Sequence, residues 1–168
     1  MRKMWRTERE DSMTLVAIDP GHTESAWVLW DGRRLLAFDK ESNDLLLDRI
    51  RRELWPFVLP EFAVIEQIKS YGMAVGAEVF ETCVWTGRFM EAFGPGMVDR
   101  LPRLEVKMHL CHDSRAKDAN IRAALIDRFG GPQSVRKGGP LYKVSGDVWA
   151  ALAVAVTWAD RQTVRGAA

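Results

Sequence analysis

Two short apolar runs in this chain each end in a carboxylate. Residues 14–19 (TLVAID) end in Asp19 before a Pro-Gly turn, and residues 62–67 (FAVIEQ) carry Glu66 near their end. β-branched runs of this length, bounded by turn residues, predict buried strands. A buried carboxylate is costly unless it is paired or binds a metal. The chain is therefore constrained to a sheet that delivers two acids to one of its edges.

A third carboxylate opens the longest apolar segment. Asp147 begins GDVWAALAVAVTWA, which predicts a helix capped by Ser145 and running to about Arg161. Three acids from distant segments suggest a convergent divalent-metal site and phosphodiester chemistry. Each acid also has a purely structural alternative: a turn cap for Asp19, a strand-edge ion pair for Glu66, and a favourable helix N-terminus for Asp147.

The remaining pattern alternates strands and helices. SAWVLWDG and RRLLAFDK predict a hairpin closed by a two-residue turn at Asp31-Gly32, which gives a three-stranded meander. Helices are expected at 42–55, capped by Ser42, at 75–93, and from Ser114 through ANIRAALIDRF. A strand is expected at 104–107 (LEVK) and a mobile basic loop at 131–144. This order predicts an α/β fold with a mixed sheet flanked by helices.

The composition fits one domain. The 168 residues, 47% of them hydrophobic, suffice for a single α/β core spanning 1–168, with flexible termini expected at 1–12 and 162–168. No apolar run approaches the roughly 20 residues that cross a bilayer, and no secretory signal is apparent, so a cytoplasmic location without membrane contact is expected. The net charge of +1 neither demands nor excludes a nucleic-acid partner.

Four motifs in order carry a resemblance to a known family. They are Ile18-Asp19-Pro20-Gly21 before a hairpin that begins SAW, Ile65-Glu66-Gln67 before a helix with Gly87-Arg88, Val106-Lys107 before SRAKDANI, and Asp147 before ALAVAVTW. Over roughly residues 14–160 the chain resembles the RuvC-type Holliday-junction resolvases of the ribonuclease H-like superfamily. It looks like a divergent bacterial or phage-like member.

The resemblance implies a fold and an activity. The fold would be a ribonuclease H-like sheet, a three-stranded meander plus two further strands. The activity would be metal-dependent, structure-selective cleavage of branched DNA such as four-way junctions, nucleoid-associated, by a homodimer. Asp19, Glu66 and Asp147 would be catalytic and would hold Mg²⁺ or Mn²⁺, two ions per active site. DNA contacts are expected at Lys107, Lys117, Arg115, Tyr71, Arg136 and Lys137.

One position departs from the family pattern. The closing motif usually carries a second aspartate three residues after the first, and here that residue is Ala150. Asp118, or Asp113 or His112 in the preceding loop, are candidates for the missing ligand, and water is another. His22 and Glu24 are less suitable because nothing in the sequence forces them inward.

Two other functions remain open from the sequence. The first is a non-catalytic junction- or DNA-binding protein that keeps the fold and has lost the site at Ala150. The second, remote alternative is a fragment of an actin-like kinase, because Asp19 to Thr23 (DPGHT) also resembles the phosphate loop of that class. Such kinases need a second domain with its own phosphate motif, for which this chain has no room.

Overall fold

A computed structural model describes residues 13–166 of the chain. Its elements are β1 (Leu15–Asp19), β2 (Glu24–Trp30), β3 (Leu35–Ser42), α1 (Asn43–Arg51), β4 (Phe62–Gln67), α2 (Ala77–Phe93), η1 (Pro95–Met97), β5 (Val98–Pro102), α3 (Arg103–Cys111), α4 (Asp118–Arg128), η2 (Gly131–Val135) and α5 (Val148–Gly166). The strands form one five-stranded sheet in the order β3-β2-β1-β4-β5. β1, β2 and β3 are antiparallel neighbours, whereas β4 and β5 run parallel to β1. The predicted mixed sheet, a meander plus two strands, is confirmed.

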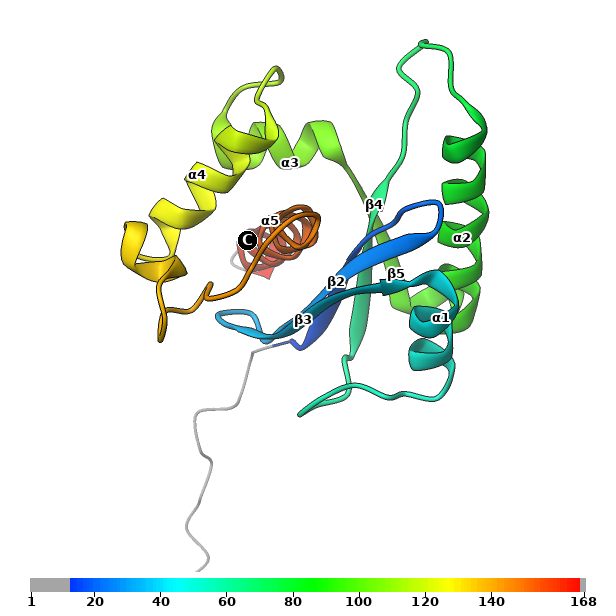
Figure 1. The fold of residues 1–168 in the computed structure, drawn as a ribbon, viewed down its shortest axis with the longest axis horizontal. Coiled ribbons are helices and arrows are strands. Elements are labelled where there is room, and N and C mark those ends of the chain that lie inside the picture. The colour runs from blue at the N-terminus through cyan, green and yellow to red at the C-terminus, as the bar shows by residue number, and fades with distance from the viewer. Residues whose placement is uncertain (1–12, 167–168) are drawn as a thin grey trace, which may run out of the picture.

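The central strand β1 is buried on both faces because helices cover the sheet on both sides (Figure 1). Its alternating residues divide between two cores: Leu15 and Ala17 belong to the core with α5, and Val16 and Ile18 to the core with α1 and α2. Asp19 continues this alternation and therefore faces the α5 side. The strand thus delivers its terminal acid to the layer that contains the last helix.

Helix α5 lies across the sheet over a face made of small and branched residues. Ala151, Leu152 and Ala155 are fully buried, and they join Ala17 and Val64 of the sheet in one core. Small side chains let a helix backbone approach the strands closely. Helix α5 extends to Gly166, beyond the end expected near Arg161. Of the termini expected to be flexible, residues 1–12 and 167–168 lie outside the described residues.

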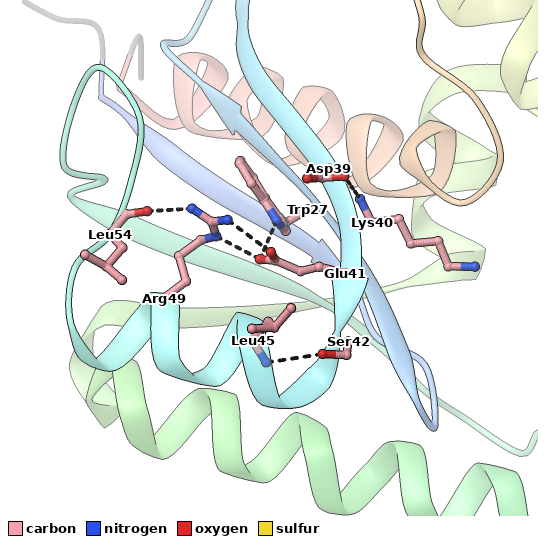
Figure 2. Close-up of polar contacts among 8 residues, drawn as sticks. All are labelled: Trp27, Asp39, Lys40, Glu41, Ser42, Leu45, Arg49 and Leu54. Carbon is pink, nitrogen blue, oxygen red and sulfur yellow. Dashed lines mark hydrogen bonds and ion pairs between the residues drawn. The ribbon is translucent and has the colours of Figure 1, made fainter.

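A cluster of polar and aromatic side chains fastens α1 to the opposite face of the sheet (Figure 2). The Glu41 carboxylate accepts hydrogen bonds from Trp27 Nε1 at 3.0 Å and from Arg49 Nε and Nη2 at 2.7 and 3.0 Å. Arg49 also donates to the carbonyl of Leu54 at 2.6 Å, which fixes the segment after α1. Every charged atom of this pair has a partner, so the cluster serves the fold.

One expected strand is a helix. The segment 104–107 lies within α3, and the fifth strand is the preceding segment, β5, which pairs in parallel with β4 from Ala63↔Val98 to Gln67↔Pro102. A four-residue segment with only two apolar residues does not distinguish strand from helix, and here Val106 is buried while Leu104 is exposed. Pairing with β4 therefore determines which segment forms the fifth strand, and the local sequence pattern does not show this pairing.

Other boundaries also differ from expectation, and α1 ends at Arg51 instead of residue 55. The first hairpin has a loop at 31–34 in place of a two-residue turn, because Asp31 Oδ1 accepts hydrogen bonds from the backbone N–H of Arg33 and Arg34. Helix α4 begins at Asp118 after Lys117, and not near Ser114. Helix α5 begins at Val148, one residue after Asp147.

The segment expected to be a mobile loop, 131–144, is packed against the domain. It contains the short helix η2, and both Ser134 and Leu141 are buried. Gly139 permits the close return of this segment, since a Cβ there would come within 2.3 Å of the Ser134 carbonyl oxygen. Within residues 13–166, no helix is both long and apolar enough to cross a membrane.

Candidate metal and active site

Two of the sequence-predicted acids lie side by side at one end of adjacent strands. β1 and β4 pair in parallel with Ile18 opposite Ile65, so the next residues, Asp19 and Glu66, occupy neighbouring positions in the same row. Residues in one row of a sheet point to the same face. Both carboxylates therefore point toward α5.

The third predicted acid reaches this row from the start of α5. Asp147 lies immediately before the helix, where its carbonyl accepts hydrogen bonds from Ala150 N and Ala151 N. A cleft of about 200 Å³ is lined by Asp19, Asp147, Asp118, Arg103 and Ala150, among others. The structure thus brings Asp19 and Asp147 to one cleft, and it places Ala150, where the family pattern has an acid, in the wall of that cleft.

The electrostatics of the row are unfavourable for ionised acids. Burial raises the pKa of Asp19 to about 8, and the charges of Glu66 and Asp147 contribute to this rise. Burial also raises the pKa of Glu66, although Arg103 opposes this effect. No residue of the described range 13–166 donates a hydrogen bond to the Asp19 side chain. Asp19 is therefore a partly buried acid whose carboxylate accepts no hydrogen bond from the described residues.

Two cations that the sequence analysis did not anticipate contact the other acids. Arg103, the first residue of α3, places Nη1 at 3.3 and 3.2 Å from the two carboxylate oxygens of Glu66, and its Nη2 donates to Asp118. Lys40 Nζ lies 2.8 Å from Asp147 and 3.7 Å from Glu24. The strand register places Lys40 in the same row as Asp19, because Asp19 pairs with Ala26 and Ala26 pairs with Lys40.

The donor set fits a hard divalent cation in its chemistry. Carboxylate oxygens are the ligands that Mg²⁺ and Mn²⁺ prefer, and a cation beside Asp19 would relieve its unfavourable charge. As the side chains stand, no three acids, histidines or cysteines within residues 13–166 are arranged to hold an ion. The reason is visible in the contacts, since Glu66 is turned to Arg103 and Asp147 to Lys40.

A buried network holds the loop that follows Asp19. Gly21 N donates to Ser25 Oγ at 3.1 Å, Ser25 Oγ donates to Asn43 Oδ1 at 2.6 Å, and Asn43 Nδ2 donates to the Gly21 carbonyl at 2.9 Å. Gly21 is required at this point, because a Cβ there would lie 2.2 Å from the carbonyl oxygen of Glu24. The Pro-Gly pair after Asp19 thus permits a tight loop that the first residue of α1 holds in place.

The alternative ligands suggested by the sequence lie in different places. Asp118 lines the cleft but is largely exposed and pairs with Arg103. Asp113 accepts a hydrogen bond from the backbone N–H of Arg115, and His112 ends α3 in a left-handed conformation. His22 lies 3.8 Å from Glu78 of α2. Of these residues, only Asp118 is placed at the cleft.

The expected DNA contacts fall into three groups. Lys107 lies on α3 close enough to lower the pKa of Glu66, and Lys117 precedes α4, whose first residue lines the cleft. Tyr71 is exposed in the segment between β4 and α2 and has a left-handed backbone. Exposed basic groups complete the set at Arg115, Arg136 and Lys137.

Comparison with known proteins locates the fold. Thermus thermophilus RuvC matches with a TM-score of 0.68 and 20% identity over 90% of this chain and 96% of that one. The same protein in complex with a Holliday-junction substrate gives 0.69 and 18% over the same shares of the two chains. The Fowlpox virus resolvase, also bound to a Holliday junction, gives 0.52 and 12%, over 89% of this chain and 99% of that one.

The chain has the fold of the RuvC-type resolvases. The predicted resemblance is thereby confirmed at the level of the fold, and it extends over nearly the whole of both chains. No family model and no curated protein matches the sequence.

The two site cations differ in how far the sequence could have revealed them. Lys40 follows from the hairpin, because pairing β2 with β3 places it in the row of Asp19 once the loop length is known. Arg103 was not found because the segment directly after it, 104–107, is predicted as a strand, whereas Arg103 begins α3. Only the pairing of β5 with β4 puts the start of α3 beside Glu66.

Proposed function

We propose that this protein is a divalent-metal-dependent, structure-selective endonuclease that cleaves branched DNA such as Holliday junctions. The observation that carries the proposal is the row of Asp19 and Glu66 closed by Asp147, within a fold shared with two junction-resolving proteins. In this proposal Asp19, Glu66 and Asp147 hold Mg²⁺ or Mn²⁺. When bound, such an ion polarises the scissile phosphate and stabilises the departing oxygen.

The residues of the chain would bind and orient the substrate around that cleft. Lys107 and Lys117 approach the site from α3 and α4 and would neutralise backbone phosphates on either side of the cut. Tyr71 presents an exposed aromatic ring on a constrained backbone, suited to contact an unstacked base at a branch point. Recognition would then depend on backbone charge and shape and not on base edges.

A homodimer would match the near two-fold symmetry of a four-way junction. Helix α2 supports this part of the proposal, because it buries Trp85 and Phe89 against the sheet and leaves Phe80 and Val84 exposed on another side. Light scattering of purified protein tests it, with Val84→Glu expected to shift a dimer to a monomer. The cytoplasmic, nucleoid-associated location expected from the sequence follows from the same role.

The deciding experiment compares Asp19→Asn with the wild type on a synthetic four-way junction. Cleavage in Mg²⁺ or Mn²⁺ should disappear, while binding in a gel-shift assay in EDTA should persist. Asp48→Asn, an exposed acid on α1, is the matched control and should cleave normally. Equal cleavage by Asp19→Asn and the wild type would rule out the assignment of this site.

A second function has one observation in its favour. Ala150 replaces an expected acid, and the remaining acids are turned toward Arg103 and Lys40. A non-catalytic junction-binding protein would show binding without cleavage in any divalent metal. The kinase alternative lacks support, since all described strands belong to one sheet and no second domain is present within residues 13–166.

A further inference from the structure

The guanidinium of Arg103 is placed as a bridging cation. Its Nη1 contacts both carboxylate oxygens of Glu66 at 3.2 and 3.3 Å, and its Nη2 donates to Asp118. A divalent ion that bridges two acidic ligands would need these same carboxylates. Arg103 and such an ion therefore compete for the same oxygens.

The position of Arg103 is enforced by the fold. It is the first residue of α3, directly after β5, which pairs with the strand that carries Glu66. Val106, one turn further along α3, is buried in the core and fixes that helix against the domain. A guanidinium is always charged and offers its donors in a rigid fork, so little entropy is lost when it holds two carboxylates.

The charges at the cleft balance with one divalent ion. Asp19, Glu66, Asp118 and Asp147 supply the acidic groups, and Arg103 and Lys40 are the side-chain cations that contact them. When all four acids are ionised, these two cations leave a charge that a single divalent ion neutralises. Ala150 contributes to the same outcome, because it removes an oxygen ligand from the cleft wall.

We propose that Arg103 is a resident cation that occupies a second metal position, so that the acidic cluster of Asp19, Glu66 and Asp147 binds one divalent ion and not two. In place of the two ions that the resemblance implies, one position is then filled by a side chain of the protein. This inference rests on the proposed function for its choice of ligand, a divalent metal. It assigns Arg103 as a positioning residue for Glu66 and Asp118.

The test is a count of bound metal ions without DNA. Mn²⁺ is titrated into the full-length wild type, Arg103→Gln, Arg103→Lys and Arg100→Gln, and free Mn²⁺ is followed by electron paramagnetic resonance. Arg100 lies on β5, three residues before Arg103, and is exposed, so its variant controls for a positive charge lost near the start of α3. Circular dichroism confirms that each variant is folded.

The expected result is one bound ion for the wild type, Arg103→Lys and Arg100→Gln, and two for Arg103→Gln. Two ions in the wild type, or an unchanged count in folded Arg103→Gln, would overturn the inference. So would a second ion in Arg103→Lys, because a lysine keeps the charge that is argued to exclude it. Junction cleavage by the wild type is measured separately, so a protein that binds metal as expected without cutting DNA would refute the proposed function alone.

Discussion

Lys40 and Glu41 are consecutive residues of β3, yet they serve opposite purposes on the two faces of the sheet. Glu41 faces α1, where two donors of Arg49 and one of Trp27 satisfy its carboxylate (Figure 2). Lys40 faces α5, where it contacts Asp147 beside Asp19, a partly buried acid that accepts no hydrogen bond from residues 13–166. The first face contains a completed ion pair that holds α1, and the second contains acids in excess of their partners.

This difference separates structural acids from acids available for chemistry. A carboxylate whose oxygens are all bonded has no lone pairs free for a ligand, and its loss is felt in stability. A carboxylate that is buried without donors costs stability and gains a function only when a cation binds. Substitutions on the two faces should therefore have effects of opposite sign on the free energy of unfolding.

The largest change in the free energy of unfolding is expected for a substitution on the face of the sheet that α1 covers. Arg49→Ala leaves Glu41 mostly buried without its cation, and it should lower the free energy of unfolding by about 3 kcal/mol. Urea unfolding measures this change. Arg52→Ala, which removes an exposed pair with Asp48 near the end of the same helix, should cost at most about 0.5 kcal/mol. Equal costs for the two variants would remove the distinction between a structural and an exposed pair.

Asp19→Asn is expected to raise the free energy of unfolding, whereas Arg49→Ala lowers it. The pKa of Asp19 is 3.8 in the unfolded reference and about 8 in the folded chain, so between these values only the unfolded chain loses the proton. The folded wild type therefore loses stability as the pH rises from about 4 to about 8. The asparagine side chain does not titrate, so Asp19→Asn should be more stable than the wild type at pH 8 in EDTA and nearly equal to it at pH 4. The full shift corresponds to about 6 kcal/mol at pH 8, and because the Asp19 side chain is partly exposed, the expected difference is about 2 kcal/mol.

Unfolding in EDTA at a series of pH values checks this expectation. Asp48→Asn serves as the control, because its side chain is exposed on α1, and its difference from the wild type should stay near zero throughout. A destabilised Asp19→Asn at pH 8 would mean that Asp19 is a structural acid like Glu41.

How far the sequence predicts this molecule depends on whether an element is defined locally or by its neighbours. β1, β4 and α1 were predicted within a residue or a few, because their apolar runs are bounded by Pro, Gly or a Ser42 cap. Segment 104–107 was assigned to a strand and is part of α3, since short apolar runs are decided by pairing with distant segments.

The site shows the same division. Asp19, Glu66 and Asp147 were found from the sequence because strand ends and a helix start mark them. Arg103 and Lys40 were not, because their positions follow from parallel pairing of β4 with β5 and from the register of β2 with β3. The position of Lys40 requires the loop length of a local hairpin, whereas that of Arg103 requires the pairing of strands that are distant in the sequence.

Asn43 connects α1, on one face of the sheet, to the loop after Asp19, and its loss should change the free energy of unfolding by an intermediate amount. Asn43 is the first residue of α1, and it holds the loop after Asp19 through Ser25 and the Gly21 carbonyl. Asn43→Ala leaves buried partners unsatisfied and should lower the free energy of unfolding by about 1.5 kcal/mol. Because the loop positions Asp19, junction cleavage should fall as well, at a temperature where the variant is fully folded. Asp44→Ala, the next residue, is the control, and full cleavage by folded Asn43→Ala would show that the loop does not position the acid.

The smallest effect on stability is expected at Lys40, next to Glu41 on β3. Its ion pairs with Asp147 and Glu24 are solvent-exposed, so Lys40→Met should change the free energy of unfolding by no more than about 0.5 kcal/mol. The same substitution frees the Asp147 carboxylate and should strengthen Mn²⁺ binding, which a titration without DNA measures. Lys69→Met, in the segment after β4, is the control. A loss of stability as large as that of Arg49→Ala would mean that both faces of β3 are structural, because Lys40 would then hold the fold as Glu41 does.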